Sequence, residues 1–185
     1  MTNEIVEKLE DAGFETYLVG GCVRDELLYR DNFDIDITSQ ARPDEILEVF
    51  KDYKTIDIGK KFGTIKVILD SSEYEITTMR TENAYVDKRH PSLVYYTDDI
   101  YEDLKRRDFT INAMAKRKEI IIDPFNGKDD LEKKIIRAVG NPYDRISEDM
   151  LRSLRAVRFA TVLGFDIDKN LKEAIRSQSK YINDI

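Results

Sequence analysis

The sequence is poor in the two residues that carry most thiol and imidazole chemistry. Its 185 residues include one cysteine, Cys22, and one histidine, His90. A lone cysteine cannot form a disulfide within the chain, so a disulfide framework is excluded and a reducing, cytoplasmic location is expected. A single histidine argues against a histidine-based relay or a histidine-rich zinc site. Any chemistry is therefore expected to rest on carboxylates, arginines and a metal ion.

Long apolar runs are also absent. No stretch approaches the roughly 18 apolar residues of a membrane-spanning helix. The first residues, MTNEIVEKLEDAGF, are charged and have helical periodicity, without the apolar core of a signal peptide. A hydrophobic content of 41% with 36% charged residues fits a packed core under a hydrated surface. We expect neither a membrane span nor a signal peptide.

The net charge of −7 argues against a protein whose whole surface coats nucleic acid. Basic residues nevertheless cluster locally, in KRR at 105–107 and in a series of arginines at 152, 155 and 158. Global acidity with local basic clusters is compatible with phosphate recognition at one site.

The order of hydrophobic patterns predicts an α/β fold over residues 1–138, followed by a helical region over 139–185. Helices are expected at 2–12, 22–30, 42–53 and 101–115 and through most of the chain from 129 onward, and strands at 16–21, 33–39, 63–70, 73–80 and 119–127. The segment 81–98 is polar, contains Pro91 and is interpreted as a mobile loop. The chain ends at Ile185 without a helix stop signal, which suggests a fragment of a longer protein.

The segment FDIDITS holds two aspartates in a β-like run. Residues two apart on a strand point to the same face, so Asp34 and Asp36 lie opposite Phe33, Ile35 and Ile37. Two adjacent carboxylates repel each other unless a cation lies between them, and Mg²⁺ prefers oxygen ligands. Glu73 and Glu75 in EYEITT alternate in the same way, and either completes the site if its strand lies next to the first. The alternative is a solvated strand face near a sheet edge.

Three further segments indicate phosphate or nucleotide binding. LVGGCVRD places Gly20 and Gly21 between a strand and a helix, with Arg24 one turn later. In LKRRDFTINAMA, Arg106 and Arg107 suit phosphate and Asp108 suits ribose hydroxyls, although an Asp103–Arg107 ion pair on a surface helix is the alternative. In SEDMLRSLRAVRF, Ser147 is expected to cap a helix that begins with Glu148 and Asp149. There, Asp149 and Arg152 either contact a base edge or belong to a helix with a Glu148–Arg152 pair.

Taken in this order, LVGGCVRD, FDIDIT, EYEITTMRTE, EDLKRRDFTINAMA, DPFNGKDDL and EDMLRSLRAVRF resemble the class II tRNA nucleotidyltransferases. That family comprises the CCA-adding enzymes and the related bacterial poly(A) polymerases. The resemblance extends over residues 14–168. It implies a polymerase-beta-like nucleotidyltransferase head with a mixed β-sheet and flanking helices, followed by the start of a helical neck. The family also has body and tail helices that grip tRNA, and we do not expect them within these residues.

The resemblance also implies roles for individual residues. Asp34 and Asp36 match the metal-binding carboxylates, with Glu75 as a third acidic position, and Mg²⁺ is the expected ion. The positions matching nucleotide-binding motifs are Gly20, Gly21, Arg24, Asp25, Arg107, Asp108, Asn112, Asp149, Arg152, Arg155 and Arg158. Of these, Asp149 and Arg152 are expected to pair with the base of CTP or ATP.

The implied activity is addition of C, C and A to the tRNA 3′ end, with CTP, ATP and the tRNA end as partners. Because the body and tail are missing, this chain is expected to retain nucleotide binding but to hold tRNA poorly. IDIGKKFGTIKV lacks the arginine-rich version associated with poly(A) polymerases. His90 stands where an arginine is expected, so a CC-adding enzyme stays open beside poly(A) polymerase. A non-catalytic nucleotide-binding module is the alternative from another class.

Overall fold

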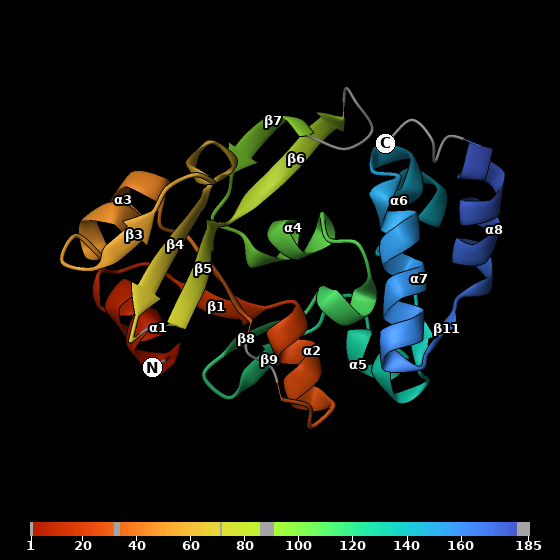
Figure 1. Ribbon diagram of the computed structural model, residues 1–185, viewed down its shortest axis with the longest axis horizontal. Coiled ribbons are helices and arrows are strands. Elements are labelled where there is room, and N and C mark those ends of the chain that lie inside the picture. Colours follow the sequence, from red (N-terminus) through yellow and green to blue (C-terminus); the bar gives the residue numbers. More distant parts are fainter. Residues whose placement is uncertain (1, 32–33, 71, 86–90, 181–185) are drawn as a thin grey trace.

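The computed structural model describes residues 2–31, 34–70, 72–85 and 91–180. Strands and helices alternate in the first half, and helices dominate after residue 126 (Figure 1). The helices are α1 (Thr2–Asp11), α2 (Gly21–Leu27), α3 (Pro43–Val49), α4 (Ile100–Lys105), α5 (Gly127–Glu132), α6 (Pro142–Glu148), α7 (Leu151–Leu163) and α8 (Lys169–Gln178), with short 3-10 turns η1 (Lys60–Phe62) and η2 (Thr110–Asn112). The strands are β1 (Thr16–Val19), β2 (Ile35–Ser39), β3 (Lys54–Ile56), β4 (Thr64–Leu69), β5 (Ser72–Thr78), β6 (Arg80–Tyr85), β7 (Pro91–Tyr96), β8 (Ala115–Arg117), β9 (Ile120–Ile122), β10 (Ile135–Ile136) and β11 (Asp166–Ile167).

A seven-stranded sheet forms the centre of the molecule, in the order β3-β4-β5-β2-β1-β8-β9. The pairing of β2 with β5 is parallel and the other pairings within this sheet are antiparallel, which confirms the predicted mixed sheet. The strands predicted at 63–70 and 73–80 are present as β4 and β5, which pair as an antiparallel hairpin. Because β5 returns beside β2, two segments about forty residues apart become direct neighbours.

Alternation along these strands separates an apolar face from a polar one. Ile37, Ile65 and Ile76 are buried against α1 and α3, where Leu9 and Phe50 complete one hydrophobic cluster. The intervening side chains point to the opposite face, which α1 and α3 leave uncovered. The sheet therefore presents its carboxylates to open space because its other face is used for packing.

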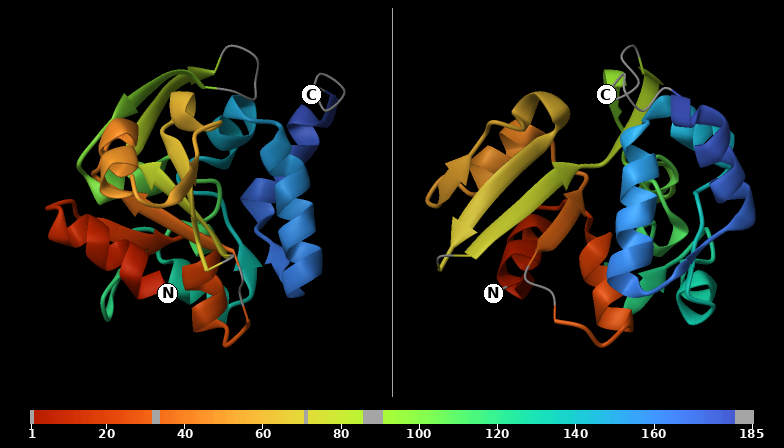
Figure 2. Two further views of the ribbon diagram at one scale, coloured as in Figure 1. Left: turned by 60° about the vertical axis from the view of Figure 1, so that its left-hand side comes forward. Right: turned by 45° about the vertical axis from the view of Figure 1, so that its right-hand side comes forward.

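The helical region shares a core with the head. Phe109 and Met114, from the segment after α4, pack in one cluster with Phe159 of α7 and Leu171 of α8. Helices α7 and α8 lie side by side in every view (Figure 2). One hydrophobic cluster thus spans residue 138, where the sequence suggests a domain boundary, and the boundary stays a prediction.

The interpretation of 81–98 as a loop is wrong for its described residues. They form the antiparallel hairpin β6–β7, a two-stranded sheet of its own (Figure 1). Val94, Tyr95 and Tyr96 favour strands, and Pro91 takes the first position of β7, where the missing N–H is tolerated. Pro91 was interpreted as a sign of a loop, but a proline at the first position of a strand does not interrupt the strand. His90 lies outside the described residues.

Two helix predictions are also wrong in part. The helix expected at 101–115 ends at Lys105, because the backbone of Phe109 and Thr110 pairs with 137–138 instead. The all-helical pattern expected after 129 is interrupted by β10 and β11, which pair in parallel. Both differences come from backbone pairing between distant segments, which local periodicity does not report.

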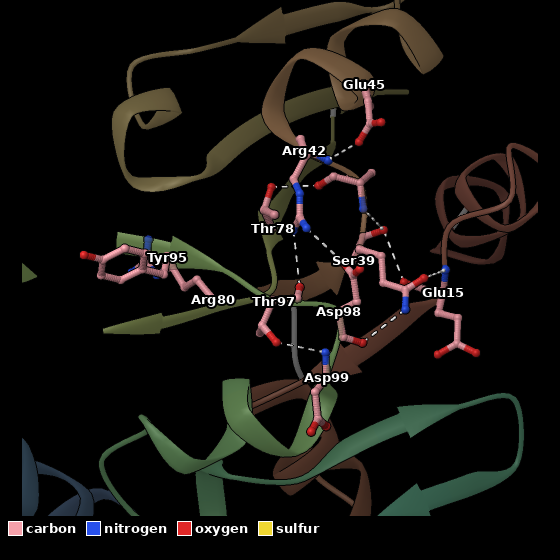
Figure 3. Close-up of polar contacts among 12 residues, drawn as sticks. Glu15, Ser39, Arg42, Glu45, Thr78, Arg80, Tyr95, Thr97, Asp98 and Asp99 are labelled. Atoms are coloured by element: carbon pink, nitrogen blue, oxygen red, sulfur yellow. Dashed lines mark hydrogen bonds and ion pairs between the residues drawn. The ribbon is translucent and has the colours of Figure 1, made fainter. Parts of the chain in front are cut away.

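Polar contacts tie the base of the hairpin to the end of β2. Arg42, before α3, donates to the carbonyl of Thr97 at 3.3 Å and pairs with Asp98 at 2.9 Å (Figure 3). The Thr78 hydroxyl donates to the Ala41 carbonyl at 2.7 Å. These contacts connect β2, β5 and β7 at one end of the sheet.

Among the described residues, no helix is both long enough and apolar enough to cross a membrane.

Candidate active site

The polar face of the sheet brings the predicted carboxylates together. In the parallel pairing of β2 with β5, Asp36 lies directly opposite Glu75. Directly opposite residues point to the same face, so these two carboxylates are neighbours. Asp34 lies just before β2 and is exposed, on the same face by alternation. The two acidic strands are therefore neighbours, which was the condition for a third carboxylate near the aspartates.

The surroundings of Asp36 disfavour its ionised form. Removal of water around the carboxylate raises its pKa, and the negative charges of Glu75 and Asp34 raise it further, against the opposing effect of Arg107 and Arg155. Crowded carboxylates of this kind are relieved by a bound cation. Their oxygen donors suit a hard divalent ion, so Asp34 and Asp36 fit the metal that the resemblance implies.

The protein does not supply a complete metal cage in this region. Among the described residues, no group of three or more His, Cys, Asp or Glu side chains is arranged to hold a metal ion. Glu75, expected as a third acidic position, therefore lies beside the pair without forming such a group. Few protein ligands are typical where phosphate oxygens and water complete the coordination of Mg²⁺.

A cavity of about 430 Å³ opens beside these aspartates. Its walls come from Gly20 and helix α2, from β2 and the residue before it, from the segment after α4, and from α7. Six arginines and four aspartates line it. The lining residues are Gly20, Gly21, Arg24, Asp25, Asp34, Asp36, Arg106, Arg107, Asp108, Asn112, Arg152, Arg155, Arg158 and Phe159. Every predicted site residue except Glu75 and Asp149 is therefore in one cavity, together with Arg106, which the sequence offered as a phosphate ligand beside Arg107, and Phe159, which the prediction missed.

Gly20 lets the two charged sides of this cavity approach each other. Its φ of 71° is positive, and a Cβ at this position would lie 3.2 Å from Arg107 Nη1 and 3.4 Å from Asp36 Oδ2. Only glycine adopts this backbone conformation readily. The glycine is required by the turn and by the approach of an arginine to the carboxylate face.

Gly20→Ala is expected to lower stability by about 1–3 kcal/mol through backbone strain and to weaken nucleotide binding by displacing Arg107. Urea unfolding and CTP titration would measure the two effects. Gly13→Ala is the matched control, because Gly13 has a φ of 94° but no atom within 4 Å of its hypothetical Cβ. Strain alone predicts loss of stability in both variants, whereas equal loss of CTP affinity in the control would contradict the role of Gly20 in the site.

A chain of side-chain contacts crosses the floor of the cavity from α2 to α7. Arg24 donates to Asn112 at 2.7 Å, and Asn112 donates to Asp108 at 3.3 Å. Asp108 in turn accepts from Arg155 at 2.7 Å. Arg24 also makes a two-point contact with Asp25, both distances being 2.8 Å. Five predicted nucleotide-binding residues thus hold one another in place, since each of these polar side chains finds a partner.

Phe159 organises three arginines of the cavity. The guanidinium groups of Arg24, Arg155 and Arg158 lie 5.2, 5.3 and 5.0 Å from its ring centre. Each is within the range of a cation–π contact. Arg158 is exposed and makes no hydrogen bond or ion pair within the described parts of the chain, so its charge is available to a ligand. The sequence signal for Phe159 was its position at the end of RAVRF, one residue after the last arginine.

A second missed residue, Asp103, supports the arginines from behind. Its side chain is fully buried and pairs with Arg106 at 2.9 Å and with Arg107 at 3.1 Å. Its Oδ1 also accepts from the backbone N–H of Arg80 at 3.1 Å. The Asp103–Arg107 pair that sequence spacing offered as the alternative to ligand binding is therefore present. This ion pair does not exclude ligand binding by Arg107. Arg107 also lines the cavity, and its buried Nε has no hydrogen-bond partner among the described residues.

The E-D-x-x-R segment lies across a helix junction. Ser147 does not cap a helix: α6 ends at Glu148, and Asp149 accepts from the Leu151 N–H at 2.9 Å where α7 begins. The predicted Glu148–Arg152 pair is present at 2.7 Å, and Arg152 also donates to the carbonyl of Arg106 at 3.2 Å. The cap was misassigned because a helix already starts at Asn141 and Pro142, six residues before Ser147. Arg152 lines the cavity, whereas Asp149 does not.

Comparison with known proteins agrees with this geometry. The family described as "Poly A polymerase head domain" matches residues 16–137. The CCA-adding enzyme of Lactobacillus delbrueckii subsp. bulgaricus is 49% identical over 182 residues, which are 98% of this chain and 46% of that protein. The CCA-adding enzyme of Streptococcus mutans is 50% identical over 182 residues, 98% of this chain and 45% of that protein. The chain thus spans about half the length of these relatives.

Solved structures give the same answer. The CCA-adding enzyme of Bacillus stearothermophilus in complex with CTP superimposes with a TM-score of 0.91 at 39% identity, covering 100% of this chain and 44% of that one. A tRNA nucleotidyltransferase complexed with a primer tRNA and an incoming ATP analog gives 0.77 at 29% identity, covering 95% and 50%. The chain therefore belongs to the class II tRNA nucleotidyltransferase family, the family of the CCA-adding enzymes and bacterial poly(A) polymerases, and carries its head domain.

Proposed function

We propose that the protein containing this chain adds C, C and A to the 3′ end of tRNA, using CTP and ATP. The observation that carries the proposal is the arginine-lined cavity beside Asp34 and Asp36. Phosphates need cationic donors, and a metal ion that acts on the reacting phosphate would need neighbouring carboxylates to hold it; this cavity offers both in one place. The relatives named CCA-adding enzymes support this choice among nucleotidyltransferases.

The triphosphate is proposed to bind along Gly20, Gly21 and the arginines. The buried Nε of Arg107 has no partner among the described residues, so a phosphate oxygen would satisfy it. Arg158 brings a positive charge that no described residue neutralises by an ion pair. The chain from Arg24 through Asn112 to Asp108 keeps the cavity wall in place before the nucleotide arrives, which reduces the cost of ordering it.

Mg²⁺ is the proposed metal, held by Asp34 and Asp36 with Glu75 next to them. When bound, a divalent ion neutralises charge on the phosphate and lowers the pKa of a coordinated hydroxyl. The pKa of Asp36 is raised by its surroundings, so a nearby cation would stabilise its ionised form. Asp34, Asp36 and Glu75, through the bound ion, would hold the 3′ end of the tRNA near the α-phosphate.

The reaction is a nucleotidyl transfer. The 3′-oxygen of the acceptor forms a bond to the α-phosphorus, and the bond from that phosphorus to the β-phosphate oxygen breaks. Pyrophosphate leaves with the electron pair, and the hydroxyl proton passes to water. The protein's residues contribute positioning and charge complementarity, which carry most of the catalysis in phosphoryl transfer.

Base selection is proposed for Asp149 and Arg152, as the resemblance implies. Arg152 lines the cavity and is held by Glu148 at 2.7 Å, so its orientation is restrained. Asp149 lies in the short junction between α6 and α7, three residues before Arg152. An acceptor and a donor with restrained orientation are what a protein needs to read a base edge by hydrogen bonding.

The decisive experiment measures incorporation of labelled CTP and ATP onto tRNA that ends at the discriminator base. The full-length protein should add C, C and then A in the presence of Mg²⁺. Addition that stops after two C residues would indicate a CC-adding enzyme, and a long adenylate tail would indicate a poly(A) polymerase. Nucleotide binding without any addition would favour a non-catalytic module.

The predicted domain division, with a head to 138 and a neck from 139, and the cytoplasmic location belong to the same proposal.

A further inference from the structure

The carboxylates belong to a longer row across the sheet. Asp36 on β2 lies opposite Glu75 on β5, Glu75 lies opposite Lys66 on β4, and Lys66 lies opposite Ile56 on β3. Directly opposite residues share a face, so the whole row points to the open side of the sheet. With neighbouring strands about 4.8 Å apart, Ile56 lies roughly 14 Å from Asp36.

A second cavity, of about 500 Å³, lies at the other end of this row. Glu75 and Lys66 form one wall, while Ile56, Ile58 and Phe62 supply apolar surface. Its volume is in the range of small-molecule sites. The side chain of Ile58 is 86% exposed, so apolar surface is presented to solvent at this position. We call this the β3–β4 cavity.

The two cavities meet the row at neighbouring positions, because Asp36 lines the arginine-lined cavity and Glu75, directly opposite it, lines the β3–β4 cavity. The arginine-lined cavity is suited to the triphosphate, including the leaving pyrophosphate. In-line transfer brings the attacking oxygen from the side opposite the leaving group. The attacking group must therefore approach the acidic row from the direction of the β3–β4 cavity.

We propose that the β3–β4 cavity binds the terminal nucleoside of the RNA acceptor, an inference that rests on the proposed function. The base packs against Ile58 and Phe62, since bases stack or pack on apolar and aromatic side chains. Lys66 contacts the preceding phosphate. Its present partner, Glu73 at 3.2 Å, is exposed, and such surface pairs contribute little, so Lys66 can exchange this partner for a phosphate.

The two cavities share one support. Arg80 donates through Nη1 to the carbonyl of Phe62, and its backbone N–H donates to Asp103. Asp103 holds Arg106 and Arg107 of the arginine-lined cavity. The wall of the β3–β4 cavity is thus connected to the nucleotide side through two side chains, which fixes the spacing between acceptor and nucleotide.

Ile58→Ser in the full-length protein tests the proposal. We expect the KM for a tRNA lacking its CCA end to rise about tenfold, while the Kd for CTP stays unchanged, because one apolar contact to the base is lost. Ile120→Ser is the matched control: Ile120 is 69% exposed and lies on β9, at the opposite edge of the same sheet. The control should retain the wild-type KM.

An acceptor whose last nucleotide lacks its base makes the test specific. The wild type should lose about tenfold in KM with this acceptor, and Ile58→Ser should lose little more, because the contact is already absent. If the substitution and the missing base each raised the KM tenfold and the two factors multiplied, the proposal would be overturned. An unchanged KM for Ile58→Ser with the normal acceptor would also overturn it. Both results presuppose an active wild type; absence of any nucleotide addition by the wild type would instead refute the proposed function.

Discussion

Asp36→Asn is expected to reduce nucleotide addition by a factor of about 10³ or more. The substitution removes one of two carboxylates that suit the metal, and charge stabilisation of that kind contributes several kcal/mol to phosphoryl transfer. The measurement is the initial rate of labelled CMP incorporation with Mg²⁺. Asp166→Asn, at an exposed position on β11, is the control and should retain full activity. An Asp36→Asn variant within tenfold of the wild type would contradict the assignment.

The same substitution should stabilise the metal-free fold. Asp36 is exposed at the surface, but partial removal of water around its carboxylate and the charges of Glu75 and Asp34 raise its pKa above its value in the unfolded chain. The folded state then binds the proton more tightly, so stability decreases as pH rises through that pKa. At neutral pH the ionised group therefore destabilises the fold, and asparagine removes the cost. Thermal unfolding in a chelator should show a higher Tm for Asp36→Asn, and a lower Tm would contradict the electrostatic argument.

Asp103→Ala should have the largest effect on stability, about 3–5 kcal/mol. The substitution leaves Arg106 and Arg107 without the fully buried carboxylate that pairs with both, and breaking a buried pair costs about this much. The affinity for CTP should fall as well, because both arginines line the nucleotide cavity. Urea unfolding and CTP titration measure the two effects.

Asp129→Ala is the matched control for Asp103→Ala. Both aspartates pair with a basic residue four positions later, but the Asp129–Lys133 pair is exposed, at 3.9 Å. An exposed pair contributes about 0–1 kcal/mol. Equal losses in the two variants would show that burial does not decide the effect.

The contribution of Asp103 should depend on pH in a defined direction. Burial raises its pKa, but the charges of Arg106 and Arg107 outweigh burial and hold the pKa below its ordinary value. A lowered carboxyl pKa gives stability that is present above the unfolded pKa, about 3.9, and is lost as pH falls through the folded pKa. The difference in unfolding free energy between wild type and Asp103→Asn should be full at pH 7 and shrink below about pH 4. A constant difference would contradict this.

Much of the candidate site was predictable because its motifs are local. The alternation in FDIDITS and EYEITT assigns Asp36 and Glu75 to polar strand faces, and the structure confirms both. The glycine pair between strand and helix follows from one short segment. Resemblance of six ordered motifs to a known family then connects the segments, which no single spacing does.

The errors have one physical origin. Periodicity continued a helix through Phe109 and placed a cap at Ser147, although the backbone of Phe109 pairs with Ala138 and α6 starts after Asn141. Asp103 was treated as a surface residue because its spacing to Arg107 is typical of exposed helices. Its burial depends on α4 packing against β1 and β8, and distant elements determine that packing.

By itself, the sequence determined which side chains face together on each element, because the periods of strand and helix are properties of the local backbone. Only the tertiary structure decided that β5 lies beside β2, that Asp36 faces Glu75 and that Lys66 and Ile56 continue the row. Strand order and register depend on contacts between segments far apart in the chain, and these form only when the apolar faces of several elements are buried together.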